Sequence, residues 1–135
     1  MTSPPIKTVI TIDDEKIDQL LYKRIMERSG LIETVIPFRM AQDALDFLAL
    51  EDRVTVDAVF VDINMPRMNG FEFLDIAAER FGSDFAKCVV VMLTTSLDPE
   101  DQARAEASET INKFLRKPLS IEDLQEVAQL VLNPT

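Results

Sequence analysis

The chain has 135 residues, 47% of them hydrophobic, which is enough for one domain with a substantial core. Its 24 acidic and 14 basic residues give a net charge of −10, which argues against binding to nucleic acid or an anionic membrane surface and suits cations or basic protein surfaces. The absence of histidine excludes the usual zinc sites and histidine-based catalysis, and the single cysteine, Cys88, excludes an internal disulfide and favours a reducing cytoplasm.

Short apolar runs and amphipathic segments alternate along the chain. The apolar, often β-branched runs predict five strands, at 8–12, 34–38, 58–62, 88–93 and 111–116. A helix is predicted after each strand, and the five helices are expected at 16–29, 41–48, 73–81, 98–108 and 121–131.

Local signals define several of these boundaries. Gly30 and Gly82 are expected to end the first and third helices. Pro37 cannot donate a sheet hydrogen bond, so the second strand is expected at an edge of the sheet. Asp98, followed by a proline, predicts a helix N-cap, and Ser120 begins a capping box.

This alternation predicts an α/β fold with a doubly wound, five-stranded parallel sheet and helices on both faces. We expect a single domain over 1–135, with its core at about 8–132, and no linker or internal repeat. Ligands of such sheets bind beyond the carboxyl ends of the strands.

The residues at those carboxyl ends are polar. They are Asp13, Asp14, Glu15, Asp62, Thr94, Thr95, Ser96 and Lys117. Clustered carboxylates repel one another unless a cation joins them, and oxygen ligands without histidine or thiolate favour a hard ion such as Mg²⁺. A carboxylate beside Mg²⁺, a lysine and a hydroxyl can act as a nucleophile toward phosphorus, because phosphoryl transfer depends mainly on positioning and charge stabilisation.

Five of these residues also have an ordinary structural interpretation. Asp14 suits a helix N-cap, Asp62 suits an Asx-turn before a proline, and Lys117 suits a solvated surface charge. Thr94 and Thr95 suit a loop. A functional site is favoured because all of these residue types fall at one edge of one predicted sheet.

The residues and their order resemble the receiver domain of response regulators in two-component signalling, of the chemotaxis-type, stand-alone kind. The resemblance extends from Thr8 to Leu132. Its motifs are Asp13-Asp14, Asp62-Ile63-Asn64-Met65-Pro66 with Asn69-Gly70, Thr94, and Lys117-Pro118. It implies the flavodoxin-like strand order 2-1-3-4-5.

The resemblance implies a role for each acidic residue. Asp62 would accept the phosphoryl group. Asp14, Asp62 and the backbone carbonyl of Asn64 would bind Mg²⁺, or Mn²⁺ in its place, and Asp13 would act on the ion through water. Such a protein is not an enzyme beyond catalysing its own phosphorylation and dephosphorylation.

The resemblance also implies a phosphate-binding lysine and two switch residues. Lys117, often preceding a cis proline bond, would pair with the phosphoryl oxygens, while Thr94 and Phe114 would rearrange on phosphorylation. Three departures bear on switching and on the lifetime of the phosphorylated form. Phe114 has no hydroxyl, Thr95 is bulkier than the usual residue, and 108–110 replaces a glycine-containing turn.

The implied partners are a sensor histidine kinase or a histidine phosphotransfer protein as phosphodonor, and a downstream target protein. The chain itself would be a monomer or a weak dimer. Because little sequence follows the last helix, we expect no output domain. This leaves three outputs open, namely docking to a target, phosphate relay and a phosphate sink.

Three other functions compete with this interpretation. A phosphatase of the haloacid dehalogenase type needs a second acid two residues after the nucleophile, where Asn64 stands. A flavodoxin-type flavin binder needs a hydroxyl- and glycine-rich phosphate loop, but the acidic segment 13–15 would repel a phosphate. A pseudo-receiver that is never phosphorylated is the strongest rival, although every acid and the lysine are present.

The helix at 98–108 (DPEDQARAEAS) offers only alanines for burial, whereas the other helices offer leucine, isoleucine or phenylalanine. Alanine buries little surface, so this helix should be held weakly against the sheet. A small free-energy bias can move such an element. We therefore expect it to be the most mobile helical region, to shift most on phosphorylation and to supply much of the partner-binding surface.

Overall fold

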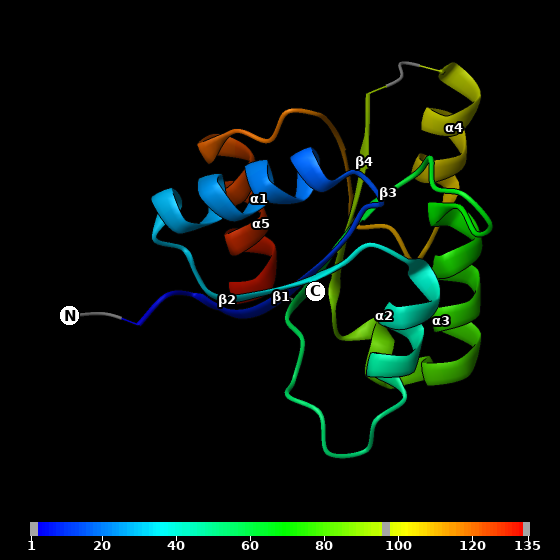
Figure 1. The fold of residues 1–135 in the computed structure, drawn as a ribbon, viewed down its shortest axis with the longest axis horizontal. Helices are drawn as coiled ribbons and strands as arrows, with labels where there is room; N and C mark the ends of the chain where they lie inside the picture. Colours follow the sequence, from blue (N-terminus) through cyan, green and yellow to red (C-terminus); the bar gives the residue numbers. More distant parts are fainter. Residues whose placement is uncertain (1–2, 96–97, 134–135) are drawn as a thin grey trace.

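One parallel sheet lies between two layers of helices (Figure 1). The computed structural model describes residues 3–95 and 98–133. In chain order the elements are β1 (Ile6–Ile12), α1 (Lys16–Ser29), β2 (Ile32–Phe38), α2 (Ala41–Leu48), β3 (Ala58–Asp62), α3 (Gly70–Ala86), β4 (Val89–Thr94), α4 (Pro99–Ala107), β5 (Lys113–Arg116) and α5 (Ile121–Leu132). The strands pair in the order β2-β1-β3-β4-β5, which confirms the expected order.

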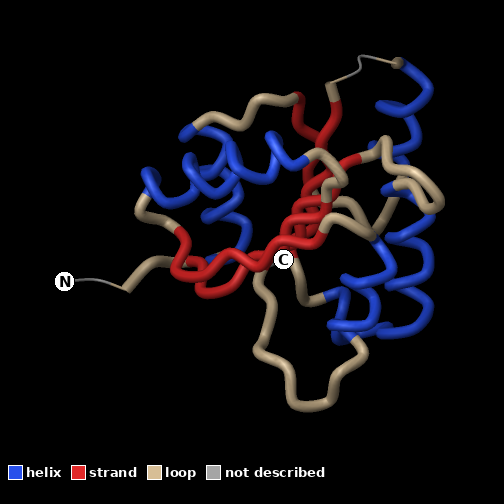
Figure 2. Tube along the Cα trace, in the orientation of Figure 1, coloured by secondary structure: helices blue, strands red, loops and turns tan. Residues whose placement is uncertain are grey.

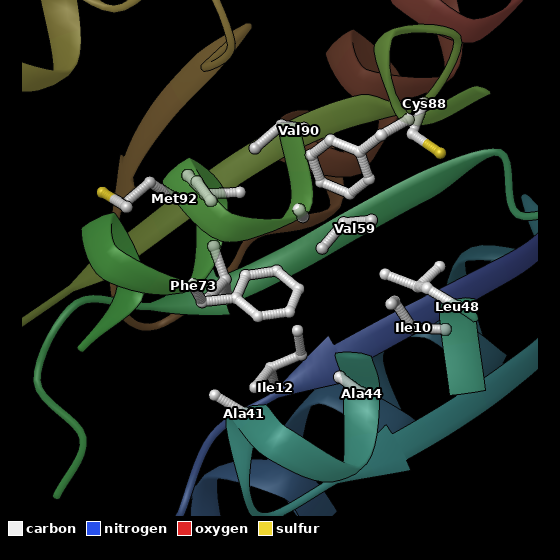
Figure 3. Packing of buried hydrophobic residues seen from close by; sticks show 14 of the residues in the cluster. Ile10, Ile12, Ala41, Ala44, Leu48, Val59, Phe73, Cys88, Val90 and Met92 are labelled. Atoms are coloured by element: carbon white, nitrogen blue, oxygen red, sulfur yellow. The ribbon is translucent and has the colours of Figure 1, made fainter. Parts of the chain in front are cut away.

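Each face of the sheet has its own apolar core, and the helices lie on either side of the strands in Figure 2. On one face α2 and α3 pack around Phe73 and Met92 (Figure 3). On the other face α1 and α5 pack around Phe60 and Leu124. Within the described ranges, no helix is both long and apolar enough to cross a membrane.

Most of the predicted elements are confirmed, but four strands differ at their ends. β1 and β2 each begin two residues earlier than expected, at Ile6 and Ile32. β5 begins at Lys113 instead of 111, because the side-chain oxygen of Asn112 accepts the N–H of Val90 at 2.7 Å and replaces a main-chain partner there. β4 begins one residue later than expected, because the N–H of Cys88 is bonded to the turn that ends α3. β2 lies at the sheet edge, as Pro37 predicted.

The predicted break of the helix at Gly82 is confirmed, but the chain resumes a helical path after it, which was not predicted. Gly82 adopts φ 50° and ψ −123°, and a further helical turn continues to Ala86. Glycine adopts this positive φ without the penalty that a side chain would add. The extra turn buries Phe85 against Phe73, with ring centroids 6.4 Å apart, and this packing explains why the chain resumes a helical path.

α1 turns a different side toward the sheet than its leucine and isoleucine residues suggest. Tyr22 and Met26 are its buried residues, whereas Ile17, Leu20 and Leu21 are 72%, 48% and 47% exposed. The hydroxyl of Tyr22 needs a buried hydrogen-bond acceptor, and the carboxylate after β1 supplies one. α1 therefore keeps an apolar strip in solvent.

The helix ends follow the predicted capping chemistry. Gly30 ends α1 at φ 68°, and the side chain of Asp98 accepts the N–H of Glu100 at 2.9 Å. Ser120 forms the expected reciprocal capping box at the start of α5. A second capping box, at Asn69 before α3, was not predicted.

Matched substitutions in α1 test which side of the helix is buried. We expect Met26→Ala to lower the free energy of unfolding by about 2–5 kcal/mol, because it removes fully buried atoms and leaves a cavity. Leu20→Ala should change it by roughly 0.5 kcal/mol or less, because this side chain is half exposed. Urea unfolding measures both values, and equal losses would contradict the observed orientation of α1.

Candidate functional site

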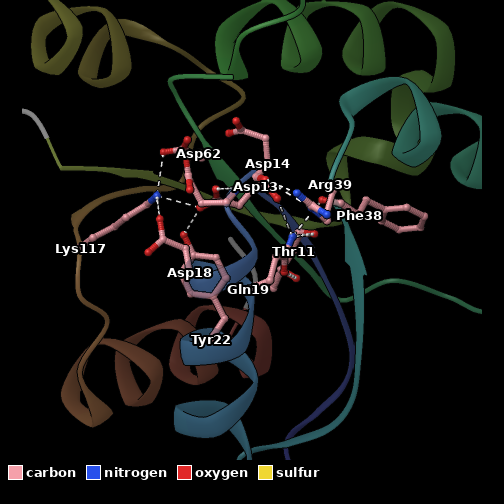
Figure 4. A network of polar contacts seen from close by, with 11 residues as sticks. Thr11, Asp13, Asp14, Asp18, Gln19, Tyr22, Phe38, Arg39, Asp62 and Lys117 are labelled. Carbon is pink, nitrogen blue, oxygen red and sulfur yellow. Dashed lines mark hydrogen bonds and ion pairs between the residues drawn. The ribbon is translucent and has the colours of Figure 1, made fainter. Parts of the chain in front are cut away.

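Four of the predicted site residues meet at the carboxyl edge of the sheet (Figure 4). Asp13 and Asp14 follow β1, Asp62 ends the neighbouring β3, and each offers a carboxylate oxygen within 4.8 Å of the other two. Asp13 is fully buried and Asp62 is 5% exposed, while Asp14 is half-buried. Lys117 reaches this cluster from the loop that follows β5.

Lys117 brings a positive charge into contact with three carboxylates. Its Nζ lies 2.7 Å from Asp13 Oδ2, 2.9 Å from Asp18 Oδ2 and 3.1 Å from Asp62 Oδ1. The lysine side chain is only 8% exposed. It is therefore a buried member of the site, and the solvated surface charge considered above is excluded.

The loop that carries Lys117 is fixed at both ends. The N–H of Lys117 donates to the carbonyl of Thr94 at 2.8 Å, which joins the loop to the end of β4. The peptide bond to Pro118 is cis, as the resemblance implies. The capping box at Ser120 then begins α5.

Asp13 is fully engaged by protein groups. Its Oδ1 accepts the N–H of Glu15 at 2.9 Å, and its Oδ2 accepts both the hydroxyl of Tyr22 and the ammonium of Lys117. A carboxylate that already accepts three hydrogen bonds is fixed in place and is a less suitable direct metal ligand than Asp14. This arrangement supports the expectation that Asp13 acts on a cation through water.

Backbone carbonyls near the site are held by two long polar side chains. The guanidinium of Arg39 donates to the carbonyl of Asp14 at 3.2 and 3.3 Å. The amide of Gln19 donates to three carbonyls at the ends of β1 and β2, those of Thr11, Asp13 and Phe38. α1 is thereby attached to two strands, and the turn that carries the acids is held in one conformation.

Gly70 allows α3 to begin directly against Asp62. A Cβ atom at Gly70 would lie 2.5 Å from the backbone oxygen of Asp62, closer than atoms can approach. The N–H of Gly70 donates to the carbonyl of Ile63 at 2.9 Å. The glycine of the Asn69-Gly70 motif is thus required by packing against the acidic residue.

The other predicted site residues lie at the same edge. Thr94 ends β4 and is 1% exposed, while Thr95 is exposed. Asn64 is exposed in the loop after Asp62, and Phe114 of β5 is half-buried against the core on the α3 side. Ser96 lies outside the described residues.

Burial and like charge oppose ionisation of Asp62. Burial, followed by the charge of Asp13, raises the pKa of Asp62 to about 6, although Lys117 opposes this shift. Burial alone would lower the pKa of Lys117, but its hydrogen bonds to Asp13 and Asp18 outweigh that effect and raise it. Burial and the hydrogen bond to Asp13 raise the pKa of Tyr22. The site therefore has an excess of negative charge that one ammonium does not neutralise.

The donor set and charge of the cluster fit a divalent cation. Asp13, Asp14 and Asp62 provide only oxygen atoms, and Mg²⁺ prefers such ligands. Burial is the main cause of the raised pKa of Asp62 and the charge of Asp13 the next, and a divalent ion would offset that charge repulsion. These three carboxylates are therefore able to hold a metal ion.

Sequence reasoning missed three polar residues of α1 that build the site. Asp18 binds Lys117, Gln19 holds the strand ends, and Tyr22 binds Asp13. Asp14, Asp18 and Tyr22 recur every four residues, and this helical spacing could have indicated that they lie on one side of the chain, facing the site. It was overlooked because the neighbouring leucine and isoleucine residues gave a plausible buried face of their own.

The sheet order, the acidic cluster and the buried lysine define a receiver-type signalling domain, and comparison with known proteins agrees. The sequence pattern of the response regulator receiver domain matches residues 9–129. The chain belongs to this family, which rules out the phosphatase and flavin-binding alternatives.

Known relatives and solved structures are similar over most of the chain. The probable methanogenesis regulatory protein FilR2 of Methanothrix harundinacea is 31% identical over 90% of this chain and 78% of its own length. The sensory/regulatory protein RpfC of Xanthomonas campestris is 31% identical over 93% of this chain. RpfC is much longer, and the match covers only 16% of its length. A two-component response regulator from Cytophaga hutchinsonii has a crystal structure with a TM-score of 0.87 and 32% identity, covering 95% of this chain and 98% of that one.

The raised pKa of Asp62 leads to a prediction about pH and stability in the absence of metal. The folded protein binds this proton more tightly than the unfolded chain does, so ionising Asp62 between about pH 4 and pH 6 should reduce stability. Asp62→Asn should therefore be more stable than the native protein above about pH 6, by roughly 1–3 kcal/mol.

Urea unfolding in EDTA across this pH range provides the measurement. The stability advantage of Asp62→Asn should shrink as the pH falls through about 6 and approach zero below about pH 3, where the native carboxyl is protonated in both the folded and the unfolded state. Other carboxyl groups titrate in both proteins, so the difference isolates Asp62. A difference that does not vary with pH would contradict the prediction.

Proposed function

We propose that this protein is a phosphorylation-activated switch in which Asp62 accepts a phosphoryl group with the help of Mg²⁺. The observation that carries the proposal is the joint placement of Asp13, Asp14, Asp62 and Lys117 at one edge of the sheet. A pseudo-receiver would not need to retain three crowded acids, whose mutual repulsion costs stability in the absence of a cation.

The chemistry proposed for Asp62 is nucleophilic attack on phosphorus. A carboxylate oxygen of Asp62 forms a bond to the phosphorus of a phosphohistidine, the P–N bond breaks, and the imidazole leaves with a proton from solvent. Water later attacks the acyl phosphate, which restores the carboxylate and releases inorganic phosphate. Mg²⁺, when bound, supplies neutralisation of the phosphoryl oxygens.

The remaining site residues are assigned positions around that step. The metal ligands are proposed to be Asp14, Asp62 and the carbonyl of Asn64, with Asp13 bound through water. Lys117 pairs with a phosphoryl oxygen, and Thr94, next to Asp62 at the end of β4, supplies the hydroxyl for another. Phe114 is proposed to adjust its packing when Thr94 moves, since it pairs with β4 and contacts the same core.

The phosphodonor is proposed to be a sensor histidine kinase or a histidine phosphotransfer protein. The exposed strip of α1, formed by Ile17, Leu20 and Leu21, supports docking of such a partner beside the site. A groove of about 510 Å³ runs from this helix to the loop after β5, and both Leu21 and Lys117 line it. A donor that covers the groove would bring its phosphohistidine toward Asp62 and exclude water from the transfer.

The signalling output is proposed to be protein docking through α4 and its surroundings. α4 buries only Ala105. Arg104 joins α4 to α3 by lying 4.2 Å above the ring of Phe71 and 3.8 Å from Asp75, and both charged side chains are largely exposed. Such exposed contacts contribute little to stability, so a small bias can move the helix. Phosphate relay and a phosphate sink remain the alternatives to docking.

Phosphorylation itself provides the first test of the function. Incubation with acetyl phosphate and Mg²⁺ should add one phosphoryl group to the native protein and none to Asp62→Asn, as measured by intact mass spectrometry. EDTA or Asp14→Ala should suppress the adduct, because each removes the cation that neutralises the phosphoryl oxygens. A full adduct on Asp62→Asn would disprove the assignment of the acceptor.

Hydrogen exchange tests the proposed output surface. Amide protons of α4 should exchange faster than those of α1, and beryllofluoride, a phosphoryl mimic, should change the α4 rates most. Asp62→Asn provides the control, because the mimic has no carboxylate to bind there. Protection of α4 equal to that of α1, with no response to the mimic, would refute the role of α4.

A further inference from the structure

Asp18 lies outside the motifs that resemble the family, yet it is one of the three carboxylates that contact Lys117. We propose that Asp18 is a positioning residue that holds Lys117 on the α1 side of the site and competes with the phosphoryl group on Asp62 for its ammonium. This inference rests on the proposed phosphorylation of Asp62. It assigns to α1 a direct influence on how long and how completely the protein stays phosphorylated.

The hydrogen-bonding capacity of Lys117 is the first reason. An ammonium has three N–H donors and no acceptor. In the structure Lys117 hydrogen-bonds to Asp13 and Asp18, at 2.7 and 2.9 Å, and forms a longer ion pair with Asp62 at 3.1 Å. All three donors are therefore directed at carboxylates. On phosphorylation the donor directed at Asp62 can pass to the phosphoryl group, and Lys117 can give a second hydrogen bond to the phosphoryl oxygens only if its contact with Asp13 or Asp18 is weakened.

Asp18 is the partner that Lys117 gives up at the lowest cost. Asp13 is fully buried and also accepts the hydroxyl of Tyr22, so breaking its contact with Lys117 would leave a buried charge poorly compensated. The side chain of Asp18 is 27% exposed at the first turn of α1, so water can solvate it once Lys117 turns away. The exchange of Lys117 from Asp18 to the phosphoryl group is thus the favoured path.

Charge acts in the same direction. Phosphorylation replaces the single negative charge of Asp62 by a group carrying roughly two. Asp18 adds another negative charge on the far side of Lys117, which disfavours this increase and draws the ammonium away from the phosphoryl oxygens. Removing the charge of Asp18 should therefore favour the phosphorylated form.

A purely structural role for Asp18 must be distinguished from this one. An acid in the first turn of a helix is stabilised by the helix dipole, whatever else it contacts. Asp43 has that role in the first turn of α2, and in the described part of the chain it forms no ion pair. Asp43→Asn is therefore the matched control for Asp18→Asn.

The test compares phosphorylation by acetyl phosphate at saturating Mg²⁺. We expect Asp18→Asn to lower the acetyl phosphate concentration needed for half-maximal phosphorylation by about tenfold, the factor that corresponds to the loss of one charge-assisted competing hydrogen bond. Asp43→Asn should leave it unchanged, and Asp18→Glu, which keeps the charge, should stay close to the native value. An unchanged or higher half-maximal concentration in Asp18→Asn would overturn the proposal.

A second measurement does not depend on phosphorylation. The side-chain ¹⁵N resonance of Lys117 should shift in unphosphorylated Asp18→Asn and stay in place in Asp43→Asn, because only the first change removes a direct partner of the ammonium. An unshifted resonance would also overturn the proposal. If the native protein gained no phosphoryl group at all, the proposed function would fail, whereas a phosphorylated native protein with an unaffected Asp18→Asn would disprove only the role of Asp18.

Discussion

The ion pair between Lys117 and Asp13 is the contact on which the site depends. It joins groups 104 residues apart in sequence, with 2.7 Å between Nζ and Oδ2, and both side chains are buried. Removing one partner of a buried pair is costly because it leaves an uncompensated charge. The pair therefore holds the loop after β5 against the turn after β1, beside three crowded carboxylates.

The sheet order makes this contact possible. β1 and β3 are neighbours, so the acids that follow them meet, and β4 separates them from β5, so Lys117 must extend back across the end of β4. The hydrogen bond from the backbone N–H of Lys117 to the carbonyl of Thr94 fixes where that extension begins. α1 completes the enclosure, since Tyr22 and Asp18 approach Asp13 and Lys117 from the helix side. The negative charge left over suits the site to a divalent cation, which would in turn offset the negative charge of the proposed phosphoryl group.

Local sequence signals predicted the parts of this arrangement that depend on local physics. β3 and α2 have the expected bounds, and the caps at Asp98 and Ser120 formed as expected, because apolar period and capping chemistry act over a few residues. The errors arose where contacts between residues far apart in the sequence determine the local structure. The helical turn after Gly82 depends on packing of Phe85 against Phe73, and the start of β5 depends on the side chain of Asn112.

The orientation of α1 shows the same limit within the site. Its sequence offers two faces, one with leucine and isoleucine and one with Asp18, Tyr22 and Met26, and periodicity alone favours the more apolar one. The structure buries the second face, because Tyr22 and Asp18 find polar partners at the strand ends that only the assembled sheet provides. This orientation leaves an apolar strip exposed, and Leu21 of that strip lines the same groove as Lys117. The same helix thus carries the proposed docking surface and contacts Lys117, which is proposed to pair with the phosphoryl group on Asp62, so one helix would serve both partner recognition and phosphorylation.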